Sequence, residues 1–221
     1  MSNATAIQLT TSDNHQLSAF LAEPDAEPRA GLVILQEIFG VTEHMQNISR
    51  RYAEQGYRTI VPALFDRVAP DSVIPYAEAD QGRALAGQCQ PNEVLKDIQA
   101  AADLVSVGNK VSVLGFCWGG TYAYLSACEL HISAAVAYYG TRIVEQLNKK
   151  PRCPVQFHFG EEDPMITPDH VEQIKAANPT QPIYVYQGAG HAFSNADRPS
   201  YHEEASRLAE DRTLSFLQQT V

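Results

Sequence analysis

Short apolar runs alternate along the chain with longer segments in which apolar residues recur every three or four positions. The continuous runs are typical of strands buried on both faces, and the longer period is typical of amphipathic helices. Strands are predicted at 5–10, 17–22, 31–36, 58–61, 111–114, 132–138, 155–159 and 183–186. Helices are predicted at 42–55, 76–87, 92–107, 121–129, 168–177 and 199–219.

This order of elements predicts an α/β fold. The first two strands are separated only by the polar cluster 12–15, which is typical of a β-hairpin turn. Strands and helices alternate from the third strand onward, which predicts a mainly parallel central sheet with helices on both faces. The length of 221 residues suits one such domain, and no repeat or linker interrupts it. We therefore expect a single domain over residues 1–221.

The net negative charge of the chain argues against partners that are themselves negatively charged. Lys and Arg number 16 and Asp and Glu 26, so the net charge of −10 argues against nucleic acid or an anionic membrane surface. No apolar run approaches the ~20 residues of a membrane span, and residues 1–8 lack the pattern of a secretory signal. We expect a cytoplasmic protein whose partner is a small molecule. The sequence leaves the oligomeric state open, and a monomer is compatible with it.

The four cysteines show neither a C-x-x-C pair nor the His/Cys spacing of a metal site. Because no export signal is present, we predict reduced thiols. The absence of a metal-ligand spacing predicts no metal, and no cofactor is expected. Cys89, Cys128 and Cys153 are interpreted as structural, whereas the residues next to Cys117 indicate a catalytic role.

Cys117 lies at the centre of the motif Gly-Phe-Cys-Trp-Gly-Gly, residues 115–120, between a predicted strand and a predicted helix. Glycines on both sides permit a turn too tight for larger side chains, and the thiol would project from that turn. The N–H of Trp118 would lie at a helix N-terminus, where it can donate to a developing oxyanion. This is the pattern of a nucleophile elbow, with cysteine in place of the usual serine. On this motif alone, a buried structural cysteine is an equal alternative.

Two further strand ends carry the groups that a cysteine nucleophile needs. Sites in parallel sheets lie at the carboxyl ends of strands. Glu161, Glu162 and Asp163 follow the strand at 155–159, and His191 follows the strand at 183–186. A thiol needs a base, and the base needs a partner that fixes its tautomer. We assign His191 as the base and Asp163, at a loop tip before proline, as its partner, with both glutamates as competitors.

Glu37 directly follows the apolar strand at 31–36, where the oxyanion-hole loop of a hydrolase begins. The N–H of Ile38 would then be the second oxyanion donor beside that of Trp118. The alternative is that Glu37 caps a helix or faces solvent.

Together these motifs resemble the dienelactone hydrolase family, of the α/β-hydrolase superfamily, over nearly the whole chain. The resemblance implies an α/β-hydrolase fold and hydrolysis of an enol-lactone in chloroaromatic breakdown, which gives maleylacetate. It implies a triad of Cys117, His191 and Asp163, and it implies that Glu37 pairs with the resting thiol and takes its proton when substrate binds. The matching segments are 20–24, 36–40, 115–120, 137–140, Asp163 and 190–191.

The resemblance also implies that the substrate's carboxylate is held by arginines. Asn195 stands where such an arginine is expected, and a neutral amide cannot replace a bidentate guanidinium on a carboxylate. Arg83 and Tyr139 are the other predicted substrate contacts. The alternatives are a general carboxylesterase for small neutral esters, a non-catalytic binding protein with the α/β-hydrolase fold, and a thiol redox protein.

Overall fold

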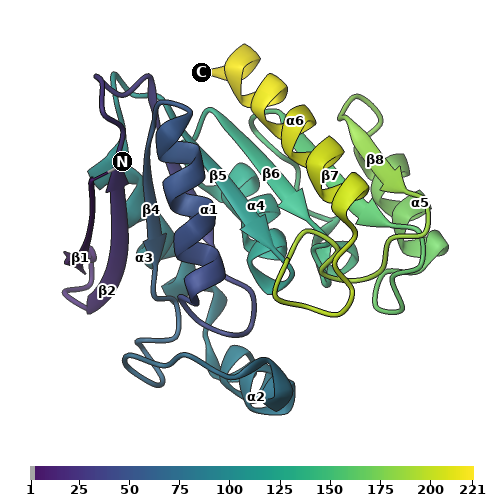
Figure 1. The fold of residues 1–221 in the computed structure, drawn as a ribbon, viewed down its shortest axis with the longest axis horizontal. Helices are drawn as coiled ribbons and strands as arrows, with labels where there is room; N and C mark the ends of the chain where they lie inside the picture. Colours follow the sequence, from purple (N-terminus) through teal and green to yellow (C-terminus); the bar gives the residue numbers. More distant parts are fainter. Residues whose placement is uncertain (1–2) are drawn as a thin grey trace. The chain divides into compact units, whose positions relative to one another are not determined.

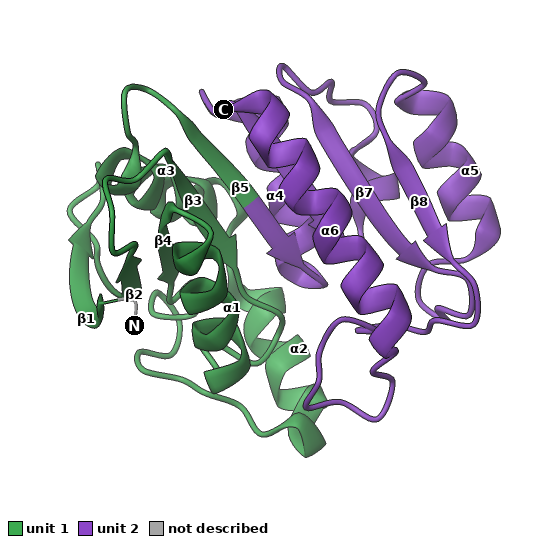
Figure 2. Ribbon diagram, turned by 45° about the horizontal axis from the view of Figure 1, so that its top comes forward, with its two compact units in different colours: residues 1–113 green, residues 114–221 purple. Residues whose placement is uncertain are grey.

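The computed structural model describes residues 3–221, which form two compact units divided between Val113 and Leu114 (Figure 2). Strand β5 (Val111–Phe116) belongs in part to each unit. The expectation of one domain over residues 1–221 stays a prediction.

In the first unit, the strands follow the order β1-β2-β4-β3 and then the first half of β5. The hairpin strands β1 and β2 are antiparallel, β4 is antiparallel to β2, and β3 is parallel to β4. Helices α1 and α3 cover opposite faces of β3 and β4 (Figure 1). The elements are β1 (Asn3–Thr10), β2 (Gln16–Glu23), β3 (Ala30–Leu35), α1 (Glu43–Glu54), β4 (Tyr57–Pro62), a 3₁₀ turn (Tyr76–Glu78), α2 (Ala79–Gln88) and α3 (Pro91–Val105).

In the second unit, the second half of β5 is followed across the sheet by β6, β7 and β8. The pairs β6–β7 and β7–β8 are parallel. Helix α6 lies on one face of these strands and α4 on the other (Figures 1 and 2). The elements are α4 (Trp118–Glu129), β6 (Ala134–Tyr138), a 3₁₀ turn (Ile143–Gln146), β7 (Val155–Gly160), α5 (Pro168–Ala177), β8 (Ile183–Tyr186) and α6 (Glu203–Thr220).

The structure confirms the predicted α/β fold: a mainly parallel sheet with helices on its faces and an N-terminal antiparallel hairpin. Every residue of β3, β5, β6 and β7 is buried, as the continuous apolar runs predict. The hairpin turn is made possible by Asn14, whose φ of 63° is a left-handed value that asparagine tolerates.

Three predicted helices begin or divide differently in the structure. The helix predicted at 121–129 already begins at Trp118, because the glycines before it permit close packing and do not break the helix. The helix predicted at 199–219 begins at Glu203, because the ring of His202 caps it by accepting a 3.3 Å hydrogen bond from the N–H of Ala205. The helix predicted at 76–87 divides into a 3₁₀ turn and α2.

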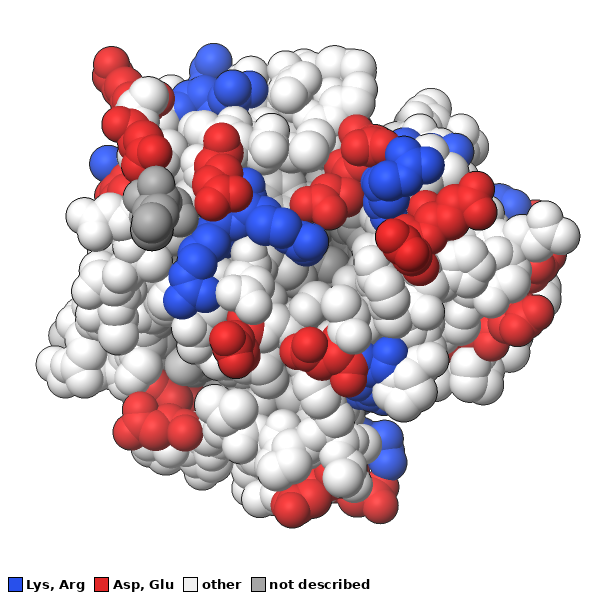
Figure 3. All heavy atoms as spheres, viewed as in Figure 1, with Lys and Arg blue, Asp and Glu red and all other residues white. Residues whose placement is uncertain are grey.

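Charged side chains of the described residues are mixed on the face shown in Figure 3, where lysines and arginines lie beside acidic groups. The ion pairs of the described residues include Arg58–Glu23 at 2.9 Å. None of the helices within residues 3–221 is long and apolar enough to cross a membrane.

Candidate active site

The backbone of Cys117 is strained in the way a nucleophile elbow requires. Its φ and ψ of 54° and −115° lie outside the regions that residues with a side chain normally occupy. The flanking glycines are required because a side chain at either position would clash with neighbouring backbone atoms. A Cβ on Gly115 would lie 2.0 Å from the carbonyl oxygen of Gly119, and one on Gly120 would lie 2.6 Å from that of Tyr138. The predicted strand–elbow–helix motif is therefore present, and no other residue type fits at these glycines.

Backbone hydrogen bonds fix the elbow between β5 and α4. The N–H of Cys117 donates to the carbonyl of Tyr138 at 3.0 Å, which ties the nucleophile to the end of β6. The carbonyl of Cys117 accepts from the N–H groups of Gly120 and Thr121 at 3.0 and 3.3 Å. Trp118 is the first residue of α4, where the helix dipole favours negative charge.

His191 lies between the thiol and a buried carboxylate. Its Nε2 is 3.2 Å from Sγ of Cys117, and its Nδ1 is 2.7 Å from Oδ2 of Asp163. The side chain of Asp163 is completely buried, and that of His191 is 15% exposed. The structure thus brings together the three residues that the sequence predicted from three separate strand ends.

The choice of Asp163 over its neighbours has a clear geometric basis. Its second oxygen, Oδ1, accepts a 2.8 Å hydrogen bond from the N–H of Met165, so the carboxylate is fixed on both sides. Glu161 turns to a different partner and accepts from the N–H of Gly188 at 3.1 Å. Glu162 is exposed. Neither glutamate makes the contact with His191 that Asp163 makes.

The surroundings of His191 favour its protonated form. Burial alone lowers the pKa of His191, but the hydrogen bonds to Asp163 and Cys117 and the charges of both partners raise that pKa to about 10. Because Asp163 accepts at Nδ1, the neutral ring carries its proton there and presents Nε2 to the thiol as an acceptor. The protonated ring would donate from both nitrogens and stabilise a thiolate.

The loop that carries His191 is tightly held. A Cβ on Gly160 would lie 2.3 Å from the carbonyl oxygen of Ala189, so the end of β7 and this loop are in close backbone contact. Ala192, the residue after the base, has a left-handed φ of 62° and is buried. The carbonyl of Phe193 accepts a 2.9 Å hydrogen bond from the N–H of His202. His191 is therefore presented by a fixed loop.

Two of the three predicted substrate contacts are completely buried, Tyr139 and Asn195. The hydroxyl of Tyr139 shares a 2.8 Å hydrogen bond with that of Ser194, and its ring meets His191 edge-on, with 5.1 Å between centroids. Oδ1 of Asn195 accepts a 3.0 Å hydrogen bond from the N–H of Asp197. Their role as substrate contacts stays a prediction, and the contact with His191 places the Tyr139 ring beside the base.

The remaining predicted site residues belong to the first unit. Glu37 is buried after β3, and its carbonyl accepts a 3.3 Å hydrogen bond from Nε2 of Gln36. The next residue, Ile38, is half-buried, and a Cβ on Gly82 would lie 2.1 Å from its carbonyl oxygen. Arg83 lies on α2 with its side chain 54% exposed, and it forms an ion pair with Asp80.

The other cysteines and the buried histidine behave as structural groups. Burial raises the pKa of Cys89, Cys128 and Cys153 to about 11, so these thiols are poor nucleophiles. His158 is completely buried and has 2.7 and 2.9 Å hydrogen bonds to Tyr186 and Gln156, as expected for a satisfied core histidine. Burial lowers its pKa to about 3. Within residues 3–221, no group of three or more His, Cys, Asp or Glu side chains could hold a metal ion.

Sequence reasoning missed two hydrogen-bonding groups of the site. The hydroxyl of Ser194 bonds that of Tyr139, and the carbonyl of Tyr138 accepts from the N–H of Cys117. The only sequence signals were the position of Ser194 shortly after His191 and the matched segment 137–140. Neither signal indicates which way the Tyr139 side chain turns.

A parallel sheet with a strand–nucleophile–helix elbow, followed in chain order by an acid and a histidine at later strand ends, defines an α/β-hydrolase. The model of the dienelactone hydrolase family matches residues 17–221, so the chain belongs to that family. Like the enzymes of this family, it is a hydrolase of carboxylic esters or lactones.

Individual relatives agree with this assignment. The chain is 34% identical to a Yersinia pestis protein provisionally named carboxymethylenebutenolidase, over 94% of this chain and 85% of the relative. It is 30% identical to a Pseudomonas putida carboxymethylenebutenolidase, over 96% of this chain and 94% of the relative. A crystal structure from Klebsiella pneumoniae, provisionally named dienelactone hydrolase, is 30% identical with a TM-score of 0.85, covering 98% of this chain and 99% of that one.

Proposed function

We propose that this protein hydrolyses an ester or lactone of the dienelactone type through a Cys117–His191–Asp163 triad and a thioester acyl-enzyme. The observation that carries the proposal is the position of the His191 ring, 3.2 Å from the thiol and 2.7 Å from the Asp163 carboxylate. The strained backbone of Cys117 adds support, because such strain gathers at functional positions. The relatives that carry the name carboxymethylenebutenolidase support the substrate class.

In the proposed reaction, His191 accepts the thiol proton at Nε2, and the sulfur of Cys117 attacks the carbonyl carbon. The carbonyl oxygen becomes an oxyanion that the N–H of Trp118, at the start of α4, would stabilise. The C–O bond then breaks, and the leaving oxygen takes the proton from His191. Water attacks the thioester and gives its proton to His191, which returns it to the sulfur as the acid is released.

Two groups of the first unit complete the proposal, and their parts rest on the family resemblance. The N–H of Ile38 would be the second oxyanion donor. Glu37 would keep the resting thiol neutral and take its proton, in place of His191, when substrate binds. A protonated His191 would then give its proton to the leaving oxygen and recover one from water, and Glu37 would return its proton to the sulfur. Replacing Glu37 by Gln should lower turnover of a lactone and change the pH profile of Cys117 alkylation by iodoacetamide. Superimposable profiles with equal turnover would remove Glu37 from the mechanism.

The form of the substrate is the second part of the proposal. Asn195, at the position of the expected arginine, is buried and uses its amide oxygen within the loop, and Arg83 is paired with Asp80. These contacts favour weak recognition of a substrate carboxylate, so a small neutral ester is the alternative substrate. Comparing kcat/KM for a carboxylated lactone and its neutral analogue distinguishes them. A strong preference for the carboxylated lactone that survives in Arg83→Ala would exclude Arg83 as its anchor.

The acyl-enzyme is tested by rapid quenching and mass spectrometry of the intact protein after mixing with an activated aryl ester. The expected result is a burst of phenol and a mass increase of one acyl group on the peptide that contains Cys117. Acylation of a different residue, or turnover in Cys117→Ala at the wild-type rate, would contradict the proposal. Cys153→Ala is the matched control, because this thiol is partly exposed and has a raised pKa.

A further inference from the structure

Tyr139, directly after β6, has a backbone conformation that is unusual for a tyrosine. Its φ of 38° is left-handed, a value that bulky residues adopt only where the surrounding structure enforces it. The carbonyl of Tyr138 accepts from the N–H of Cys117 at 3.0 Å, and the N–H of Tyr139 donates to the carbonyl of His158 at 2.8 Å. This dipeptide therefore connects the backbone of the nucleophile to strand β7.

The side chain of Tyr139 connects the same dipeptide to the base. The ring is completely buried and meets the His191 ring edge-on at 5.1 Å between centroids. A buried tyrosine hydroxyl needs a hydrogen-bond partner. Ser194, on the loop that carries His191, is that partner at 2.8 Å. The ring of Phe193, also on this loop, packs edge-on against Tyr139 at 5.4 Å.

We propose that Tyr139 and Ser194 are positioning residues, which hold the His191 ring on the line between Cys117 and Asp163. This inference rests on the proposed triad. The hydrogen bond that Nδ1 of His191 donates to Asp163 fixes one end of the imidazole but still permits rotation about that bond, and the Tyr139 ring packed against His191 blocks this rotation. Ser194 keeps the Tyr139 ring and the histidine loop together. Because the buried Tyr139 would act through His191, its loss should change kcat and leave KM unaltered.

The test is a set of variants assayed on one activated ester. Tyr139→Phe keeps the ring and removes the hydroxyl, and it should lower kcat by about threefold to tenfold, the factor that corresponds to one hydrogen bond of ordinary net strength. Ser194→Ala should lower kcat by a similar factor. The double variant should be no slower than the slower single variant, because both changes remove the same hydrogen bond. Ser194→Thr keeps the hydroxyl and should restore kcat.

The matched control is Tyr124→Phe on α4, which also removes the hydrogen-bonding hydroxyl of a buried tyrosine, here the donor of a 3.1 Å bond to the carbonyl of Lys149. Its kcat should equal that of wild type. Wild-type kcat in Tyr139→Phe, independent losses that multiply in the double variant, or a change confined to KM would each overturn the inference. If Cys117→Ala is inactive in the same assay, the triad stands whatever these variants show. Should Tyr139→Phe not fold, Ser194→Ala and Ser194→Thr carry the test.

Discussion

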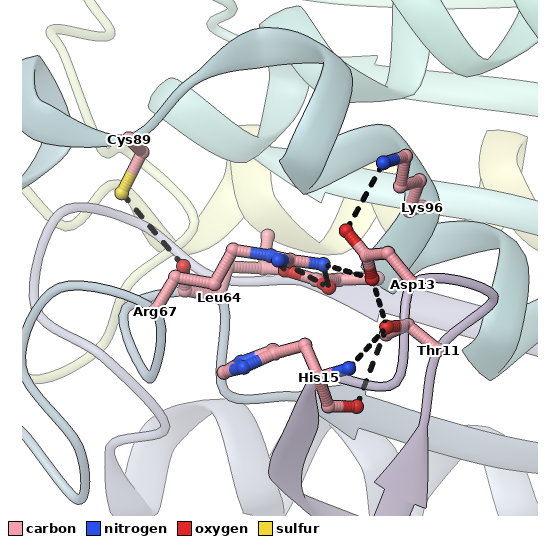
Figure 4. Close-up of polar contacts among 8 residues, drawn as sticks. Thr11, Asp13, His15, Leu64, Arg67, Cys89 and Lys96 are labelled. Atoms are coloured by element: carbon pink, nitrogen blue, oxygen red, sulfur yellow. Dashed lines mark hydrogen bonds and ion pairs between the residues drawn. The ribbon is translucent and has the colours of Figure 1, made fainter.

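A buried carboxylate anchors a cation in each of the two units, Asp97 in the first and Asp163 in the second. Asp97 accepts hydrogen bonds of 2.7 to 3.1 Å from the guanidinium of Arg67. Arg67 also donates to Asp13 at 3.0 Å, and Asp13 accepts from Lys96 at 3.0 Å (Figure 4).

Asp163 instead holds His191, whose other nitrogen faces the Cys117 thiol. A guanidinium keeps its protons at every pH that a protein meets, whereas an imidazole can release one. The cluster around Asp97 is therefore structural because its cation is an arginine, whereas the histidine on Asp163 can take part in catalysis.

The two units also differ in which residues have a strained backbone. Among the described residues with a positive φ, the non-glycine members of the first unit are all amides or acids in turns, residue types that tolerate this conformation: Asn14, Asp71 and Asn109. Those of the second unit are of types that do not, and all three lie at the candidate site: Cys117, Tyr139 and Ala192. In the second unit, strained backbone conformations therefore occur at the residues of the candidate site.

The largest expected effect comes from removing the nucleophile. Cys117→Ala should lower kcat by about 10³-fold or more, because the members of a triad act as a unit. Arg67→Met in the other buried cluster should leave kcat within about twofold of wild type at a temperature where the variant is folded, since Arg67 has no part in the proposed reaction. Steady-state kinetics on an activated ester gives both values. Comparable losses of kcat would mean that the two clusters are not functionally distinct.

The next effect concerns the choice of acid. Asp163→Asn should lower kcat by about 10²- to 10⁴-fold, because the amide holds the wrong histidine tautomer. Glu162→Gln, one position away and exposed, is the matched control and should remain close to wild type. A larger loss in Glu161→Gln or Glu162→Gln than in Asp163→Asn would show that the acid was assigned incorrectly.

The sequence predicted those parts of the site that depend on local geometry. Gly115 and Gly120 marked the elbow, because only glycine fits the turn. The proline after Asp163 marked a loop tip, and the predicted strand ends placed His191. The start of α4 was predicted three positions late, at 121, because adjacent glycines usually interrupt a helix. Here the same glycines allow the helix to lie against the end of β6.

The contacts that sequence reasoning did not reach depend on the direction of one side chain. Tyr139 and Ser194 are 55 residues apart, and they meet only because the left-handed φ of Tyr139 turns its ring toward the histidine loop. No periodicity encodes such a backbone angle. The burial of Asn195 is of the same kind, because its Asx-type hydrogen bond to Asp197 depends on how the loop closes.

A third prediction uses the different proton affinities of the two clusters. The pKa of His191 is raised from 6.5 to about 10, so its stabilising contribution is fully present below about pH 6.5 and is lost as the pH rises through 10. The difference in unfolding free energy between wild type and His191→Gln should therefore shrink as the pH rises over that range. Urea unfolding at several pH values measures it.

Arg67→Met should give the opposite trend. It leaves the buried carboxylate of Asp97 without its partner, which costs about 3–5 kcal/mol. Burial raises the pKa of Asp97, although the Arg67 hydrogen bonds lower it, so the unpaired acid would be neutral at low pH and charged at higher pH. The deficit in unfolding free energy should hold steady or grow with pH. Parallel pH trends in the two variants would contradict the assignment of His191 as the titrating cation.

The smallest predicted effect tests the strain at the elbow directly. At an ordinary buried position, changing alanine to glycine costs about 1 kcal/mol, because glycine loses more entropy on folding and removes a methyl group. At position 117 the φ of 54° and ψ of −115° suit glycine far better than alanine. Cys117→Gly should therefore be about 1 kcal/mol more stable than Cys117→Ala, the reverse of the usual order. Ala127→Gly on α4, which is buried in a regular helix, should show the ordinary loss against wild type. The urea unfolding midpoints of wild type and the three variants measure these differences. If Cys117→Gly is less stable than Cys117→Ala, the elbow stores no strain. The two units would then differ in their side chains and not in backbone strain.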